Sequence, residues 1–260
     1  MTATFRGLHH GDAPLLLPNA WDVASALAFA DAGFPAVGTT SFGVAATAGR
    51  PDAGRATREA NLRLAHELSR LPIHVSVDIE DGYDDDPGRV AEFVADLGVA
   101  GVNIEDSSAE RLITPGTHAA KVAAIKRQVP DVFVNARVDT YWLGQDADVA
   151  ATLARAHAYV DAGADGVFIP GVTEPDEISA LTTDITVPVN VLVVPGLSID
   201  ELRALGVRRV STGSLPYRAA ITAAVRVATA ARDGDPLPAA TSYPEMQAQL
   251  VHYASGIGAE

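Results

Sequence analysis

Acidic side chains gather at three places where an apolar run of the sequence ends. The segment VDIEDGYDDD at 77–86 carries six acids in ten positions, directly after the apolar run that begins at Ile73. The segments GVNIED at 101–106 and VFVNARVD at 132–139 repeat this arrangement, and the latter adds an arginine. Carboxylate oxygens are the ligands that hard divalent ions prefer, and an arginine offers a planar fork for a substrate carboxylate. The pattern predicts metal-assisted chemistry on a small carboxylic acid.

The alternation of side chains along each run indicates which of these groups share a face. Asp78 and Glu80 oppose the apolar side chains of their run, and Glu105 and Arg137 do the same in theirs. If neighbouring strands turn these polar faces inward, the charges meet at the carboxyl end of a barrel, where barrel enzymes carry their catalytic residues. Unpaired charges in such a place are costly, so we expect a bound cation or a matching arginine.

We therefore predict that Asp78, Glu80 and Glu105 ligate Mg²⁺, with Mn²⁺ as the alternative, and that Arg137 binds a substrate carboxylate. The competing interpretation makes each acid a solvated charge at a strand end and Arg137 the counter-ion of a buried carboxylate. The other acids are expected to cap the helices that follow them: Asp81, Asp84, Asp85, Asp86 and Asp106.

The elements that must position these residues alternate between short β-rich runs and stretches with helical spacing. About eight such units follow one another, with helical spacing at 22–32, 57–68, 89–97, 147–162, 199–205 and 217–231. The joints ADAGFPAV, ADLGVAGV, DAGADGV and RALGVRRV each end a helix at glycine shortly before a strand. We predict an α/β fold, a (β/α)8 TIM barrel with an additional C-terminal helix. A doubly wound open sheet is the alternative, but no G-x-G-x-x-G follows the first run.

Length and composition are consistent with one barrel. The chain has 260 residues, 48% of them hydrophobic. We predict a catalytic barrel domain at 1–234 and a helical extension at 235–260, after the proline-rich stretch GDPLPAATSYPE. The extension is a candidate for packing on a neighbouring subunit.

Net charge and cysteine content exclude several classes of function. The chain has 33 acidic and 19 basic residues, so its formal charge of −14 disfavours nucleic acids and anionic membranes as partners. The absence of cysteine excludes disulfides, thiolate metal sites and a cysteine nucleophile. No apolar segment is long enough for a signal peptide or a membrane span, so we expect a cytoplasmic protein.

Taken together, five segments resemble the isocitrate lyase and phosphoenolpyruvate mutase superfamily, in its phosphonomutase-like form. The likeness covers roughly residues 8–232, and its segments occur in the family's order: LPNAWDVASALAFADAGFPAVGTTSFGVAATAGRPD, VDIEDGY, GVAGVNIEDS, FVNARVDTY and RAHAYVDAGADGVFIPG. The resemblance implies a Mg²⁺-dependent barrel that makes or breaks C–C or P–C bonds beside a 2-oxo acid through an enolate.

The resemblance also implies roles for particular residues. Asp78 corresponds to the family's principal metal-side aspartate, Glu80 stands where a second aspartate is usual, and Glu105 fits the acid of the IED strand. Arg137 corresponds to the arginine that grips the substrate carboxylate, and Asp52 to the acid that closes the loop after the second strand.

A further segment corresponds to the family's oxo-acid cradle. The residues Thr40, Ser41 and Phe42 lie where backbone amides and small side chains hold the carboxylate and the enolate oxygen. Family likeness further implies a homodimer or homotetramer.

The sequence departs from both branches of this superfamily. The lyase branch places a cysteine in a loop after the fourth strand, whereas NIEDSSAERLITPGTHAAKV is shorter and has none. The mutase branch has a histidine after the sixth strand, and Pro170 stands there in this chain. The segment DGYD replaces the family's Thr-Gly-Tyr/Phe-Gly. The group that moves protons is left open between Tyr83 and the loop at 107–118.

The leading hypothesis is a Mg²⁺-dependent lyase-type enzyme that acts on a small 2-oxo acid or 2-hydroxy polycarboxylate, for example by decarboxylating an oxaloacetate-like acid. The alternatives are a catalytically idle barrel that binds a 2-oxo acid and a phosphonopyruvate hydrolase or mutase. A Schiff-base aldolase is disfavoured, because the only lysines, Lys121 and Lys126, both fall in a predicted helix rather than at a strand end.

Overall fold

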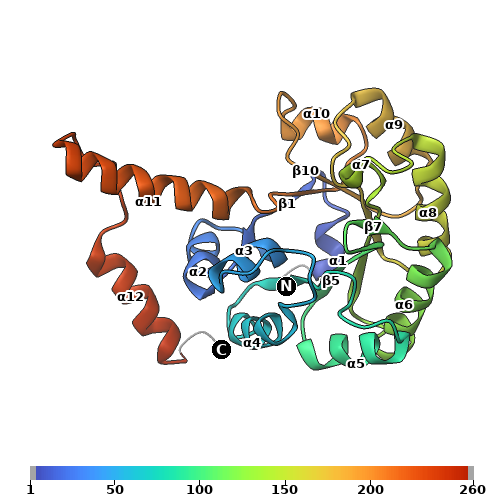
Figure 1. Cartoon of the computed structure of the whole chain (residues 1–260), viewed down its shortest axis with the longest axis horizontal. Helices are drawn as coiled ribbons and strands as arrows, with labels where there is room; N and C mark the ends of the chain where they lie inside the picture. The colour runs from blue at the N-terminus through green and yellow to red at the C-terminus, as the bar shows by residue number, and fades with distance from the viewer. Residues whose placement is uncertain (1–3, 257–260) are drawn as a thin grey trace.

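A barrel of parallel strands forms the core of the computed structural model, which describes residues 4–256 (Figure 1). Its sheet follows the order β1-β11-β10-β9-β8-β5-β4-β3-β2, and every pair in it is parallel. The barrel strands are β1 (Leu15–Leu17), β2 (Asn19–Ala20), β3 (Ala36–Thr39), β4 (His74–Asp78), β5 (Gly101–Glu105), β8 (Phe133–Arg137), β9 (Gly166–Phe168), β10 (Val189–Leu192) and β11 (Arg209–Ser211).

The barrel closes at a proline in its first strand. Only Pro18 separates β1 from β2, and β1 pairs with β11 whereas β2 pairs with β3. The carbonyl of Pro18 accepts from the amide of Gly38 at 2.8 Å, so the ladder to β3 continues past the break. Proline has no N–H to donate, which explains why the strand is divided at this residue. Because β1 and β2 occupy one strand position, the predicted (β/α)8 barrel is confirmed.

Helices alternate with the barrel strands along the chain. Six of them match the predicted ranges to within two residues at each end. For α6 the sequence predicted a helix around the two lysines without bounds, and α9 was not predicted. Both of these begin with proline in the first turn, a common helix start. The helices are α1 (Phe5–Leu8), α2 (Val23–Asp31), α3 (Ser41–Thr47), α4 (Arg58–Leu68), α5 (Pro87–Leu97), α6 (Pro115–Gln128), α7 (Thr140–Leu143), α8 (Val149–Asp161), α9 (Pro175–Asp184), α10 (Ile199–Ala204), α11 (Leu215–Asp233) and α12 (Tyr243–Ala254).

Helix ends follow the signals in the sequence. Asp86 caps α5 by accepting from the amides of Gly88 and Arg89 at 2.7 and 3.1 Å, as predicted. Gly98 then ends α5 in the left-handed region, with φ of 62°, and the other predicted joint glycines also have positive φ. The chain can therefore turn from each helix into the next strand within a few residues.

The outer faces of the strands make the main apolar core. Val77, Val102, Ile104 and Val134 are fully buried against the surrounding helices. The inner faces are polar in the middle of the barrel, where the side chains of Asn103 and Asn135 hydrogen-bond at 2.9 Å. The predicted division into an apolar outer face and a polar inner face is what brings the acids to the barrel mouth.

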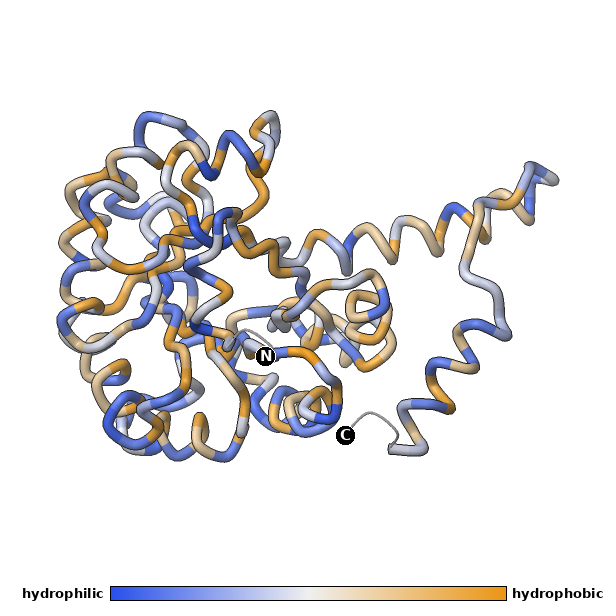
Figure 2. Tube along the Cα trace, turned by 180° about the vertical axis from the view of Figure 1, so that it is seen from behind, coloured by the Kyte–Doolittle hydropathy of each residue, from blue (hydrophilic) through white to orange (hydrophobic). Residues whose placement is uncertain are grey.

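The last two helices leave the barrel and form an arm, defined here as residues 215–254 (Figure 1). No residue of α11 or α12 is buried, and Figure 2 shows hydrophobic positions along both helices. Of the twelve large hydrophobic side chains that are exposed in the described chain, nine lie at 215–251. The predicted boundary at 234/235 falls at the end of α11, yet α11 extends from the barrel together with α12. Residues 257–260 of the predicted extension lie outside the described part.

No helix within residues 4–256 combines the length and the apolar character that a bilayer crossing requires.

We predict that the arm packs on a second copy of this chain. Large exposed apolar patches commonly mark contact surfaces, and a self-complementary contact would bury the apolar side chains of both arms. Ile221→Glu with Val225→Glu should reduce the solution mass measured by light scattering, because charges on this face oppose burial. Thr222→Glu is the control, since its hydroxyl bonds only to the carbonyl of Arg218 in its own helix. An unchanged mass in the double variant, or a monomeric wild type, would contradict the prediction.

A second prediction concerns His9, which is buried at the opposite end of the barrel from its mouth. Its Nδ1 lies 2.9 Å from the carbonyl of Phe5, and its ring stacks on Phe133 with centroids 4.1 Å apart. Burial, reinforced by the charge of Arg209, lowers the pKa of His9 to about 3. The unfolded chain therefore binds a proton below pH 6.5 that the folded chain does not, so stability should fall as pH drops from about 6.5 toward 3.

His9→Gln should remove up to about 1.4 kcal/mol per pH unit from this slope, measured by urea unfolding at pH 5, 6 and 7.5. The neighbouring exposed residue provides the matched control His10→Gln. Equal slopes in the two variants would show that His9 is not buried in its neutral form.

Candidate active site

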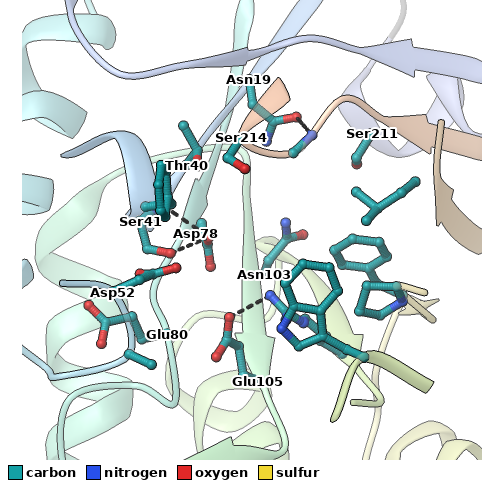
Figure 3. A pocket seen from close by; sticks show the side chains of 18 of the residues that line it. Asn19, Thr40, Ser41, Asp52, Asp78, Glu80, Asn103, Glu105, Ser211 and Ser214 are labelled. Atoms are coloured by element: carbon teal, nitrogen blue, oxygen red, sulfur yellow. Dashed lines mark hydrogen bonds and ion pairs between the residues drawn. The ribbon is translucent and has the colours of Figure 1, made fainter. Parts of the chain in front are cut away.

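A cavity of about 580 Å³ opens at the carboxyl ends of the barrel strands (Figure 3). Six carboxylates and two arginines line it: Asp52, Asp78, Glu80, Asp81, Glu105, Glu110, Arg137 and Arg218. The predicted residues Thr40, Ser41 and Phe42 also line it, whereas Tyr83 is not among the lining residues. The barrel thus brings all but one of the predicted site residues to a single cavity.

Asp78 is the last residue of β4, and only one of its two carboxylate oxygens is hydrogen-bonded within the described chain. Its Oδ2 accepts from the amide and the hydroxyl of Ser41 at 3.2 and 2.9 Å. Its Oδ1 is buried and has no hydrogen-bond partner among the described residues. Burial raises the pKa of Asp78, against the opposing charge of Arg137. The negative form of Asp78 is therefore under-compensated by the protein itself.

Glu80 is committed to holding the loop at 51–57. Its two oxygens accept from the hydroxyl of Thr57 and from the amide of Arg55, the latter at 2.8 Å. Burial raises the pKa of Glu80. Its φ of 48° places it in a turn beyond β4, so the strand alternation that predicted its direction no longer applies. Glu80 lines the cavity, but it acts on the site mainly by fixing this loop.

Glu105 and Arg137 form an ion pair across β5 and β8. The two residues are register partners, and Nη1 of Arg137 lies 2.5 Å from Oε1 of Glu105. Nε of Arg137 also donates to Asp139 at 2.5 Å. Burial raises the pKa of Glu105 well above its usual range in spite of Arg137. Within the described chain no acceptor lies on Nη2 of Arg137, so this atom is available to a substrate carboxylate.

The predicted cradle at Thr40, Ser41 and Phe42 differs from expectation in its details. The amide of Thr40 donates to the carbonyl of Ala20 at 3.2 Å, and that of Ser41 donates to Asp78. Among these three amides, only that of Phe42 lacks an acceptor in the described residues. Ser41 therefore positions a carboxylate of the protein itself, which strand alternation alone does not reveal.

Asp52 and Tyr83 lie on different sides of the loop at 51–57. Asp52 is exposed on the loop and lines the cavity close to Asp78 and Glu80 (Figure 3). Tyr83 is buried behind the loop, where its hydroxyl contacts Thr57 at 2.9 Å and the amide nitrogen of Asn61 at 2.5 Å. Tyr83 thus reaches the site only through Thr57 and Glu80, a placement that suits positioning better than proton transfer.

The donor set fits a hard divalent ion held mainly by one carboxylate. The described residues contain no group of three or more acidic or histidine side chains close enough to share an ion directly. Mg²⁺ commonly uses one or two carboxylates and keeps several waters, and the unpartnered Oδ1 of Asp78 supplies such a ligand. Asp52, Glu80 and Glu105 lie around it in the cavity. Burial is the main cause of the raised pKa values of Glu80 and Glu105, and the negative charges of Asp78 and Asp52 raise both further.

Beneath the acids lies a buried arginine that the sequence analysis missed. The fully buried Arg209 donates from Nη2 to Oδ1 of Asn103 at 3.1 Å, and its Nη1 has no partner in the described chain. Burial lowers the pKa of Arg209 to about 9, and only the charge of Asp78 opposes this. The alternation of RRVS at 208–211 places Arg209 inward with Ser211, so the signal was present in the sequence.

Of the five acids that were expected to cap helices, only Asp86 does so. Asp85 pairs with Arg55, Asp84 accepts from the amide of Asp86 at 2.9 Å, and the other two acids are buried.

Asp106 is fully buried and accepts from the hydroxyl of Tyr159 at 2.6 Å and from Arg155 at 3.0 Å. It also accepts from the amide of Asp139 at 2.8 Å, which fixes the residue that holds Arg137. Asp81 pairs with Arg55 at 2.5 Å. Asp106 and Asp81 therefore support the residues around the site. Each is held by an ion pair with an arginine and caps no helix.

The loop after β5 is a short hairpin in this chain. Its strands are β6 (Ser107–Ser108) and β7 (Arg111–Leu112), joined by Ala109 and Glu110 with φ of 48° and 60°. The side chain of Gln145 accepts from the amide of Leu112 at 3.2 Å and donates to the carbonyl of Glu110 at 2.9 Å. The hairpin is therefore fixed to the segment after α7.

Both lysines lie outside the cavity lining, which agrees with the argument against a Schiff-base aldolase. Lys121 donates to the carbonyl of Asp81 at 2.7 Å, and Lys126 pairs with Asp165 at 2.9 Å.

Comparison with known proteins agrees with this geometry. The sequence matches the phosphoenolpyruvate phosphomutase family over residues 5–232. It is 58% identical to the uncharacterized protein MT2054 of Mycobacterium tuberculosis (strain CDC 1551 / Oshkosh), over 96% of this chain and 97% of that one. It is 28% identical to the 2-methylisocitrate lyase of Bacillus subtilis (strain 168), over 87% of this chain and 80% of that enzyme.

Among solved structures, a phosphonopyruvate hydrolase in complex with oxalate and Mg²⁺ superposes with a TM-score of 0.81 and 25% identity. The superposition covers 97% of this chain and 96% of the hydrolase. The family match spans the whole barrel and every lining residue named above, so the chain is a member of the phosphoenolpyruvate phosphomutase family, an enzyme family of the isocitrate lyase superfamily.

Proposed function

We propose that the protein is a Mg²⁺-dependent lyase that cleaves a C–C bond beside the 2-oxo or 2-hydroxy group of a small carboxylic acid. The observation that carries this proposal is the buried, unpartnered Oδ1 of Asp78 in a cavity that Arg137 also lines. The oxalate and Mg²⁺ bound by the phosphonopyruvate hydrolase support the same pair of ligands here.

The chain's own residues supply binding and orientation. Ser41 fixes the rotamer of Asp78, and Asp139 and Glu105 fix the guanidinium plane of Arg137. Arg137 would hold a substrate carboxylate through Nη2, which sets the torsion of the bond to be broken. When bound to Asp78, the divalent ion would stabilise negative charge that develops on the substrate's 2-oxo oxygen.

Proton transfer must balance the bond cleavage. For a 2-hydroxy acid, the hydroxyl proton leaves and C2 becomes a carbonyl carbon. The C2–C3 electron pair passes to C3, where the carboxylate attached to C3 delocalises it as an enolate that then takes a proton. For an oxaloacetate-like acid, loss of CO₂ leaves the pair in the enolate of the remaining oxo acid. Asp52 lines the cavity on an exposed loop, and we assign it the exchange of these protons with solvent.

Cleavage of a C–C bond is favoured over cleavage of a P–C bond. Pro170 lines the cavity at the position where the mutase branch has histidine, so no proton donor stands there. A phosphonate would bring more negative charge to a cavity that already has six carboxylates. The likeness to a 2-methylisocitrate lyase supports the same choice.

A catalytically idle barrel that binds a 2-oxo acid is the second candidate. The short hairpin fixed by Gln145 favours it, because the described chain places no long loop over this edge of the cavity.

Charge and the exposed arm suggest the setting in which the enzyme works. We propose that the protein is a cytoplasmic homodimer or homotetramer. Because its formal charge is −14, we propose that it binds neither nucleic acid nor membrane. The apolar side chains of the arm would form the subunit contact.

The test is a turnover panel of oxaloacetate, phosphonopyruvate, 2-methylisocitrate and 3-alkylmalates, with and without Mg²⁺. We expect turnover of at least one C–C substrate that EDTA abolishes and Mg²⁺ or Mn²⁺ restores. Asp78→Asn should lower kcat/KM by about 10²–10³-fold, since it removes a charge that acts at the reacting oxygen. Glu92→Gln, on the exposed side of α5, is the control and should leave kcat/KM unchanged.

Turnover that is insensitive to EDTA would contradict the metal mechanism. Binding of oxalate with Mg²⁺, detected by calorimetry without turnover of any substrate, would favour the idle barrel.

A further inference from the structure

The cavity has two chemically different halves. The acids at its metal side come from the ends of β4 and β5 and from the loop at 51–57. The opposite wall is formed by the last residues of β9, β10 and β11 and by residues that follow β8, β10 and β11. It includes the polar residues Ser211, Thr212 and Ser214, and its large apolar members are Trp142, Phe168, Leu192, Val193, Pro195 and Leu215. This set is called the apolar wall below. Trp142 and Phe168 also pack against the guanidinium of Arg137, whose Cζ lies 5.5 and 5.7 Å from their ring centroids. The other four members have no part in the proposed chemistry.

The apolar wall is open to solvent at the mouth and closed at its base. Trp142 is 56% exposed and Val193 is 42% exposed, whereas Phe168 is only 5% exposed. Large apolar side chains that face a cavity in this way lose contact with water when a ligand covers them. A ligand that places an apolar group on this wall therefore gains the most binding free energy from it.

Size points in the same direction. A four-carbon oxo diacid has about nine non-hydrogen atoms, and even at the roughly 30 Å³ that liquid water takes per molecule it would fill less than half of the cavity. The cavity volume of about 580 Å³ suits a larger ligand. An acid bound at Asp78 and Arg137 alone would leave the wall unoccupied.

Charge disfavours a further carboxylate at the base of the apolar wall. Of the two arginines that line the cavity, Arg137 already contacts Glu105 and Asp139. Arg218 is exposed and donates to the hydroxyl of Ser214 at 3.3 Å. Arg218 has no carboxylate partner among the described residues, but it lies at the exposed rim of the cavity. A third substrate carboxylate against the buried part of the apolar wall, at Phe168, would therefore lose water without gaining a counter-ion, which is unfavourable. The remote part of the ligand is therefore uncharged.

We propose that the cavity takes 2-oxo or 2-hydroxy acids that carry a bulky alkyl or aryl substituent, with the substituent seated on the apolar wall. The inference rests on the proposed function for the position of the acid end. It differs from that function in specifying the remote end, and it disfavours tricarboxylates. Aromatic side chains in the wall suit an aryl group, which can stack on or meet them edge to face.

The test measures binding rather than turnover. Calorimetry in the presence of Mg²⁺ compares pyruvate, phenylpyruvate and 4-methyl-2-oxopentanoate with 2-methylisocitrate as the tricarboxylate. We expect the two substituted acids to bind at least about 10-fold more tightly than pyruvate, because each buried CH₂ contributes severalfold. Leu192→Gln should remove most of this preference and leave the affinity for pyruvate unchanged. Leu250→Gln, an exposed leucine on α12, is the matched control and should keep the preference.

The outcomes separate the two proposals. Equal affinities for pyruvate and phenylpyruvate would overturn the substituent inference and leave the proposed function standing. Tighter binding of 2-methylisocitrate than of phenylpyruvate would overturn the charge argument. Failure of all four acids to bind with Mg²⁺ would overturn both proposals.

Discussion

Negative charge held in a poorly solvated barrel mouth is the constraint on which the site depends. Asp78 and Glu105 both have raised pKa values because burial penalises their charged forms. The protein compensates this charge only in part, with Arg137 beside the acids and Arg209 beneath them. Buried negative charge that is only partly compensated destabilises the protein unless a bound cation supplies the missing positive charge. The cavity therefore favours cations.

The surroundings of the acids are built to keep them in place. Ser41 occupies one oxygen of Asp78, and Thr57 and Arg55 occupy both oxygens of Glu80. Behind them, Asp106 fixes the backbone of Asp139. These contacts hold the carboxylates close together, where like charges would otherwise move apart. The positive φ values of Glu80 and Arg55 indicate that the turns in which these two residues lie are also constrained.

The sequence predicted the barrel and most of the site because both follow from the period of two in a strand. Alternation correctly placed Asp78, Glu105 and Arg137 at one end of the barrel, since each is the last residue of its strand. It failed at Glu80, two residues beyond the end of β4, where a left-handed turn changes the direction of the side chain.

Other details depend on contacts between distant segments, which no local pattern reports. The pairing of Asp81 with Arg55 and of Asp106 with Arg155 is set by tertiary packing. Arg209 is a different case, because the alternation was readable at 208–211 but a buried, partly unpaired arginine is not expected from general rules of burial.

The hairpin of β6 and β7 affects how water is kept from the reacting atoms. Its turn is short and its edge is tied down by Gln145, so it has little length with which to swing across the opening. An enolate in an open mouth would be protonated by bulk solvent without control. A substrate whose apolar substituent filled the space beside Trp142 would itself shield the enolate carbon from water. Desolvation of the reacting atoms would then depend on the substrate and not on the closure of a loop.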